Sequence, residues 1–240
     1  MKKRILAIAL ALAMLLPVFA VGPFAATPEE QAQALLDQTS AIFESGKYTL
    51  KARGPSLAGK TTSIVFVVDG DRSVFEATMD WVSMLQEMEP ANASSMLMGW
   101  VMQLLFGSKV RFIAEPDQAT IVFVNRRTYI DVPGTPGLAL GFTTLFDVPE
   151  RTATTVSEPV IGGKKYLCAA LEGDEDVTTS YYYLNGALKR IGMEALNTDT
   201  GQTETFAFEI DLLSPTADQS YFTTNWMLKL SSLFNMILPF

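Results

Sequence analysis

One stretch of the chain matches a motif with known chemistry. Residues 54–61 read Gly-Pro-Ser-Leu-Ala-Gly-Lys-Thr, which fits the GxxxxGK[ST] pattern of phosphate-binding loops. That chemistry needs a buried strand before the loop and a helix after it, so that backbone N–H groups converge on the phosphates. Residues 62–68 are mostly β-branched or aromatic and indicate a strand where the helix should be. We therefore expect an ordinary hairpin loop and no nucleotide ligand.

The residue types most often used for catalysis are scarce. The chain contains no histidine, which excludes Ser-His-Asp triads, Cys-His pairs and histidine-ligated metals. Its single cysteine, Cys168, lies in an apolar stretch with no histidine to activate it, so we expect a buried, inert thiol. We expect a protein that is not an enzyme and carries no cofactor; an enzyme is the third possibility, and its reaction would have to use carboxylates, Lys or Tyr without imidazole.

Two acidic segments could supply oxygen ligands for a cation. Asp69 and Asp71 flank a glycine, and residues 172–176 contain four acids. Neither segment has the ligand spacing, the glycine and the closing glutamate of an EF-hand loop. We expect polar hairpin turns at both places and no metal site.

The first 26 residues have the composition of a secretory signal peptide. A basic Met-Lys-Lys-Arg start precedes an uncharged apolar run over residues 5–20, and small residues near 20 and 26 could mark the cleavage site. No cysteine stands there, so a lipid-anchored N-terminus is not expected. We predict an exported protein, either extracellular or in the periplasm and cell envelope.

Charge and size limit the partners and the number of domains. The chain has 18 basic and 26 acidic residues; without the basic residues at positions 2–4 the counts become 15 and 26, a formal charge of −11. Nucleic acid is therefore not an expected partner, because phosphate binding depends on clustered Lys and Arg. Since 48% of residues are apolar, residues 27–224 can form one domain with an ordinary core.

The mature chain is predicted to begin with a helix and to continue mainly as strands. Thr27 as N-cap, Pro28 at the first helical position and Glu30 three residues past the cap predict a helix that ends at Gly46. Strand-like runs follow, separated by turn sequences. They are residues 47–53, 61–69, 73–79, 109–114, 120–124, 128–132, 152–157, 164–172, 181–184, 188–196 and 204–212.

The connections between these runs favour antiparallel pairing. The clearest hairpin has Asn185-Gly186 as its turn, a pair suited to the positive φ angles of a type I′ turn. Short turns rule out the helical crossovers that parallel strands need. In residues 204–212 the apolar and polar residues alternate, which predicts one buried face. That face would carry Phe206, Phe208, Ile210 and Leu212.

The segment 79–106 is the most apolar part of the predicted domain. Its first half has a one-sided helical pattern, whereas residues 96–106 contain one strongly polar residue, Gln103, so that no face of this helix is polar. Six methionines lie in the segment, and flexible thioether side chains suit surfaces that adapt to varied apolar partners. Plain core packing explains the pattern equally well.

The last segment, residues 225–240, is also apolar. At 16 residues it is shorter than the ~20 needed to cross a bilayer, so we expect a packed or membrane-surface helix.

The order of elements resembles the LolA and LppX-like family. An N-terminal helix is followed by a sheet beginning Tyr-Thr-Leu-Lys-Ala-Arg at 48–53, apolar helices midway, the hairpin Tyr-Tyr-Tyr-Leu-Asn-Gly-Ala-Leu at 181–188, and Ala-Asp-Gln-Ser-Tyr-Phe at 217–222. The resemblance implies an α+β fold in which a curved antiparallel sheet, an incomplete barrel, wraps apolar helices that leave a cavity for lipid. The chain departs from the family pattern by its C-terminal extension.

These patterns lead to a functional hypothesis with one alternative. The first is an exported, noncatalytic binding protein for a lipid or other apolar ligand, held between the curved sheet and the Met-rich helices. The expected ligand-lining residues are Trp81, Met84, Leu85, Met88, Met98, Trp100, Met102 and Phe106. The alternative is a cell-envelope interaction or structural module that docks on a membrane or protein partner through its apolar C-terminal helix.

Overall fold

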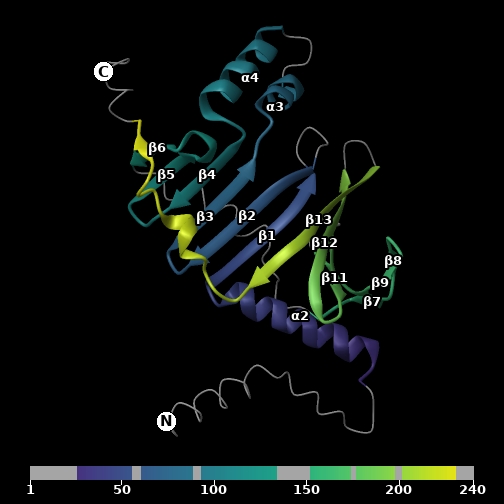
Figure 1. Ribbon diagram of the computed structural model, residues 1–240. Helices are drawn as coiled ribbons and strands as arrows, with labels where there is room; N and C mark the ends of the chain where they lie inside the picture. The colour runs from purple at the N-terminus through teal and green to yellow at the C-terminus, as the bar shows by residue number, and fades with distance from the viewer. Residues whose placement is uncertain are drawn as a thin grey trace, which may run out of the picture.

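A computed structural model describes residues 26–55, 61–88, 93–133, 152–173, 177–197 and 202–230 (Figure 1). The predicted signal peptide, apart from Ala26, and residues 231–240 lie outside these ranges. The helices are α2 (Pro28–Glu44), α3 (Trp81–Met88) and α4 (Ala93–Phe106), with 3-10 turns η1 (Val124–Arg126) and η3 (Gln219–Phe222). The strands are β1 (Lys47–Pro55), β2 (Thr61–Asp69), β3 (Arg72–Thr78), β4 (Lys109–Ala114), β5 (Gln118–Phe123), β6 (Thr128–Pro133), β7 (Thr155–Ser157), β8 (Val160–Ile161), β9 (Lys164–Lys165), β10 (Leu167–Glu172), β11 (Val177–Leu184), β12 (Ala187–Asn197), β13 (Gln202–Ser214) and β14 (Leu228–Lys229).

Twelve of these strands form one curved sheet that does not close into a barrel. Their order is β14-β6-β5-β4-β3-β2-β1-β13-β12-β11-β10-β7, and β8 and β9 form a separate hairpin. Every pair among these described strands is antiparallel except β14 with β6. The predicted curved antiparallel sheet is therefore confirmed. The seam between β1 and β13 joins two meanders that lie far apart in the sequence, with Thr49 opposite Ser214.

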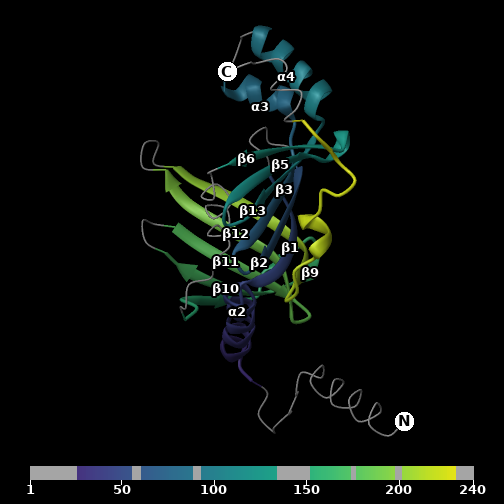
Figure 2. The same ribbon diagram turned by 90° about the vertical axis from the view of Figure 1, so that its left-hand side faces the viewer.

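Helix α2 lies against one face of the sheet, called here the inner face. Thr27 and Glu30 form the predicted capping box. Ala32, Leu36 and Phe43 pack against apolar side chains of β1, β2 and β10 to β12. Because α2 contacts β1 and also β7 and β10, which are several strands away, the sheet bends around this helix (Figure 2).

A β-bulge changes the predicted face of β13. Lys51 pairs with Leu212 and Ala52 pairs with Ile210, so one extra residue is inserted in β13 at this point. Ile210 is buried on the inner face, but the bulge turns Leu212 outward and Leu213 inward. Phe206 and Leu212 are both exposed. The prediction of four buried residues on one face was therefore wrong for these two.

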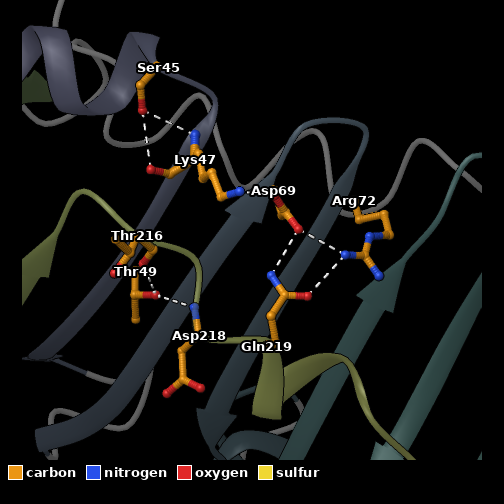
Figure 3. Close-up of polar contacts among 8 residues, drawn as sticks. All are labelled: Ser45, Lys47, Thr49, Asp69, Arg72, Thr216, Asp218 and Gln219. Carbon is orange, nitrogen blue, oxygen red and sulfur yellow. Dashed lines mark hydrogen bonds and ion pairs between the residues drawn. The ribbon is translucent and has the colours of Figure 1, made fainter. Parts of the chain in front are cut away.

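A strap formed by residues 215–230 crosses the outer face of the sheet. Tyr221, Phe222 and Met227 pack there on a second apolar cluster that includes Val67 and Val122. Polar side chains tie the start of the strap to the sheet (Figure 3). Each of these contacts joins residues separated by about 150 positions or more in the chain.

Two residues of β1 and β2 supply most of these ties. Thr49 Oγ1 donates to the carbonyl of Thr216 at 2.8 Å and accepts from the N–H of Asp218 at 2.9 Å. The Asp69 carboxylate accepts hydrogen bonds from Gln219 Nε2 at 2.9 Å and from Arg72 at 2.8 Å (Figure 3).

The α3–α4 hairpin does not lie inside the curve of the sheet. β3 runs directly into α3 and α4 runs directly into β4, and these two strands are neighbours. The hairpin therefore extends beyond the strand ends and stands clear of both faces (Figures 1 and 2). The expectation that the sheet wraps the Met-rich helices was wrong, because both helices lie beyond the ends of β3 and β4. Among the described helices, α2 occupies the inner face.

The start of the predicted C-terminal helix is not helical. Residues 225–227 form a turn and Leu228–Lys229 form β14. Leu228 N–H donates to Arg127 O and Leu230 N–H donates to Tyr129 O, so the edge strand β6 supplies the backbone partners that a helix would have supplied.

Candidate functional site

A row of apolar side chains crosses the inner face from strand to strand. In an antiparallel sheet, paired residues point to the same side. The register places Leu50 opposite Phe66, Phe66 opposite Phe75, and so on across six neighbouring strands. The inner row consists of Leu50, Phe66, Phe75, Phe112, Ile121 and Ile130.

Burial along the inner row changes at β3. Leu50 and Phe66 lie in the cluster that α2 covers and are fully buried. Phe75, Phe112, Ile121 and Ile130 are only half-buried. The aromatic part of the row is continuous, since ring centroids are 5.0 Å apart for Phe66 and Phe75 and 6.2 Å apart, in a stacked arrangement, for Phe75 and Phe112. The four residues of the row from β3 to β6 thus form a half-buried apolar surface, which borders the cluster under α2 at Phe75.

A second apolar surface lies on α4. Gly99, Met102, Gln103 and Phe106 lie toward the interior of the hairpin, and the opposite side of the helix is exposed. Leu97, Trp100 and Leu104 are 66%, 60% and 71% exposed. The exposed α4 face consists of Met96, Leu97, Met98, Trp100, Val101, Leu104 and Leu105.

Specific contacts fix α4 to α3 and to the sheet. A Cβ atom on Gly99 would lie 2.6 Å from the Cα of Val82, so glycine permits the close approach of the two helices. Trp81 Nε1 donates to the carbonyl of Gly107 at 2.6 Å, and the ring of Phe106 lies 4.4 Å from that of Phe123. The hairpin is therefore attached at its base and presents its α4 face outward.

Arginine and tryptophan side chains lie beside the base of α4. Arg126 Nη2 donates to the carbonyls of Gln103 and Leu104 at the C-terminal end of the helix. Arg127 lies over the ring of Trp226 at 5.5 Å. Arg126, Arg127, Trp226 and the neighbouring Leu228 are all exposed.

The expected ligand-lining residues lie together on the hairpin and not over the sheet. Trp81, Leu85, Met102 and Phe106 are half-buried at or near the α3–α4 interface, and Met98 and Trp100 are exposed. The side chains of Met84 and Met88 lie outside the described part. Among the described side chains, Phe106 at the base of the hairpin contacts Phe123 on the inner face.

The inner row was missed by sequence reasoning. Each of its residues lies in a strand that was predicted, but the row exists only through the pairing register. Phe66 lies in the continuous apolar run 64–68, so alternation gives no signal there. Phe75 and Phe112 each have one charged neighbour, and the order of the hairpins would have been needed to align the three rings.

Two buried titratable groups, Tyr183 and Cys168, have raised pKa values. Burial raises the pKa of Tyr183 to about 12, and its hydroxyl lies 3.0 Å from Thr39 Oγ1 under α2. Burial likewise raises the pKa of the Cys168 thiol, which favours its protonated form. Within the described ranges, no group of three or more His, Cys, Asp or Glu residues could hold a metal ion.

The GxxxxGK[ST] match lies in a hairpin. Gly54 belongs to β1 and Thr61 to β2, and these strands pair antiparallel with no helix after the loop. Residues 56–60 lie outside the described part. The strand that follows confirms the expected structural context, which is not that of a phosphate-binding loop.

An open groove of about 540 Å³ lies along the first half of α2. Glu29, Glu30, Gln33 and Asp37 line it together with Ala34, residues 152–154 and Val156, so that three acidic side chains stand beside apolar ones. It lies at the opposite end of the molecule from the hairpin (Figure 1). No helix of the described residues is both long and apolar enough to cross a membrane.

No protein-family model matches the chain, and no curated protein matches it. Two solved structures show a distant likeness. An uncharacterized conserved protein from Thermus thermophilus is 7% identical with a TM-score of 0.36, and the match covers 82% of this chain and 98% of that one. A crystal structure of MucB is 12% identical with a TM-score of 0.37, covering 82% and 64% of the two chains. At these TM-scores neither structure assigns a family, ligand or activity to this chain.

Proposed function

We propose that this protein is an exported, noncatalytic binding protein for a lipid or another apolar molecule, which it holds against the inner face of its curved sheet. The observation that carries the proposal is the half-buried part of the inner row, Phe75, Phe112, Ile121 and Ile130. These side chains form an apolar strip on the inner face of the bent sheet, and the strip borders the cluster under α2 at Phe75.

The physical basis of binding would be the removal of apolar surface from water. Burial contributes about 25 cal/mol per Å², so a ligand that covers a few hundred Å² of this strip gains several kcal/mol. Aromatic rings also add rigid contact area at low entropic cost. Nothing in this arrangement requires a metal, a cofactor or a nucleophile.

The element order that underlies the resemblance to the LolA and LppX-like family supports the same proposal. A capped N-terminal helix, a sheet that bends around it and the Asn185-Gly186 hairpin are all present. Membership in that family and export through a signal peptide are parts of the proposal. The Met-rich helices, by contrast, are not assigned to the ligand site, because they lie beyond the sheet.

The alternative of docking through a C-terminal helix is weaker. Residues 225–230 form a turn and a strand on the edge of β6. The start of that segment is therefore not the apolar helix on which this alternative depends.

The proposal is tested by uptake of an apolar fluorescent dye, N-phenyl-1-naphthylamine, into protein from which copurified lipid has been extracted. Phe112→Ser together with Ile121→Ser should lower dye affinity about tenfold or more, because both changes remove apolar area from the strip. Leu212→Ser is the matched control, since it removes an exposed apolar side chain from the opposite face of the sheet.

Circular dichroism and thermal melting must show that each variant folds. Native mass spectrometry of the untreated protein should also reveal a bound apolar molecule. Equal dye affinity in the double variant and the wild type would overturn the proposal, as would bare polypeptide combined with no dye uptake by the delipidated wild type.

A further inference from the structure

We infer that the α3–α4 hairpin is a membrane-docking element, with the exposed α4 face entering the interfacial region of a phospholipid bilayer. This interaction surface goes beyond the proposed ligand site and does not depend on it. Its occupant is a lipid surface, and the structure favours that occupant in four ways.

The first is the composition of the face itself. The seven large side chains of the face are apolar, Ser94 is the one other exposed side chain among those described on α4, and α4 contains no charged residue along its 14 positions. The only ionisable residue in the two helices is Glu87 on α3. A contiguous apolar face of this kind is unusual on a surface that meets only water.

The second is the tertiary setting. A helix that is apolar on all sides cannot by itself lie flat at a membrane surface, because it has no polar face. Packing at Gly99 removes one side of α4 from solvent and leaves a single exposed side. Among the described side chains, α4 thus has one exposed apolar side, as an interfacial anchor needs.

The third is the position of the hairpin. It projects beyond the ends of β3 and β4, clear of the rest of the sheet (Figures 1 and 2). A flat, extended surface can therefore reach α4 without first meeting another part of the described molecule. At about 21 Å in length, α4 is too short to cross a hydrocarbon core and suits an orientation in the plane of the interface.

The fourth is the charge beside the face. Arg126 lies at the C-terminal end of α4, and Arg127 lies over Trp226 next to the exposed Leu228. Arginine attracts lipid phosphate, and tryptophan favours the headgroup level of a bilayer. On a chain with an excess of acids, this local pair of cations complements an anionic membrane surface.

The test is cosedimentation of the full chain with vesicles of equal parts phosphatidylcholine and phosphatidylglycerol. The wild type should bind, and Trp fluorescence should shift to shorter wavelength. Leu97→Asp with Leu104→Asp should lower the partition coefficient by about tenfold or more, since both side chains would enter the apolar layer. Arg126→Gln with Arg127→Gln should weaken binding to these vesicles and leave binding to pure phosphatidylcholine nearly unchanged.

Val160→Asp is the matched control. Val160 is 68% exposed, close to the exposure of Leu97 and Leu104, but lies on β8 at the other end of the molecule. It should bind vesicles as the wild type does. The Leu97→Asp, Leu104→Asp variant should retain dye uptake at the inner face, so that loss of vesicle binding alone identifies the docking surface.

Three results would overturn the inference. The wild type could fail to bind vesicles, or the aspartate variant could bind as well as the wild type. Light scattering could instead show a dimer that the aspartate variant converts to a monomer, which would assign the α4 face to a second copy of the chain.

Discussion

At the scale of single residues, the strap depends on a few polar side chains with defined partners. Asp69 lies on β2 and accepts hydrogen bonds from Gln219 in the strap and from Arg72 across the turn. Lys47 adds a third contact, an ion pair at 3.4 Å. One carboxylate therefore connects the turn between β2 and β3, the start of β1 and the strap (Figure 3).

This arrangement predicts a pH dependence of stability. Hydrogen bonds from Gln219 and then from Arg72 hold the pKa of Asp69 below its ordinary value. The unfolded state therefore binds a proton more readily, so the stabilisation is present above about pH 4 and is lost as the pH falls through the lower, folded pKa. Asp69→Asn should lower the urea midpoint at pH 7, and the difference from wild type should shrink below pH 4.

The control is Asp117→Asn, which alters an exposed carboxylate in the turn between β4 and β5. It should leave the urea midpoint unchanged at both pH values. A difference between Asp69→Asn and wild type that stays constant down to pH 2 would contradict the assigned role of the Asp69 charge.

At the scale of elements, local signals predicted the pieces better than their placement. The α2 capping box and the Asn185-Gly186 turn, with φ of 53° and 76°, followed from residue types alone. Most strand positions did so too. The bulge beside Lys51 could not be predicted, because it depends on how β13 meets a strand about 160 residues earlier.

The α3–α4 helices show the same limit. Their apolar pattern indicates that something must cover them, but it does not say which surface does. The family resemblance implied that they lie inside the curve of the sheet, whereas their attachment to β3 and β4 places them beyond the strand ends. The inner row was missed for the converse reason, since it comes from the alignment of separate strands.

Close packing within the hairpin gives a second prediction. Gly99→Leu would place a side chain against the backbone of Val82 and force the helices apart, which we expect to cost ~1–3 kcal/mol. Hydrogen exchange should become faster over the hairpin and remain slow in β1 and β2. Val101→Leu, at an exposed position of the same helix, should change neither the stability nor the hydrogen exchange of the hairpin. Slow exchange in the Gly99→Leu hairpin would contradict the packing described here.

At the scale of the whole molecule, a buried ion pair links the sheet to the strap near its middle. Glu76 on β3 is 1% exposed; Arg111 on β4 contacts it at 2.7 Å and also donates to the carbonyl of Tyr221 at 3.0 Å. Lys109 Nζ forms an ion pair with the other carboxylate oxygen, Oε1, at 2.7 Å. This positive charge compensates Oε1, which accepts no other hydrogen bond from the described residues.

Removing both members of this pair should cost less than the sum of the costs of removing each one alone. Arg111→Leu leaves Glu76 buried with reduced compensation and frees the strap carbonyl, so the free energy of unfolding should fall by ~3–5 kcal/mol. Arg111→Leu with Glu76→Leu should lose less than the sum of the two single changes in urea denaturation.

Arg53→Leu, which breaks the exposed pair with Asp211, is the control and should have only a small effect. If the double variant at Glu76 and Arg111 lost as much stability as the two single variants combined, the two side chains would not be energetically coupled.

The seam between β1 and β13 has a consequence for how the molecule is made. The edge of β1 opposite β2 has a partner only after β13, residues 202–214, pairs with it. The two meanders therefore cannot merge until nearly the whole chain is available. Contacts of such long range slow folding. A chain cut short before residue 202 would display the β1 edge as an open template for other polypeptides, and it should accumulate as aggregates and not as a shortened fold.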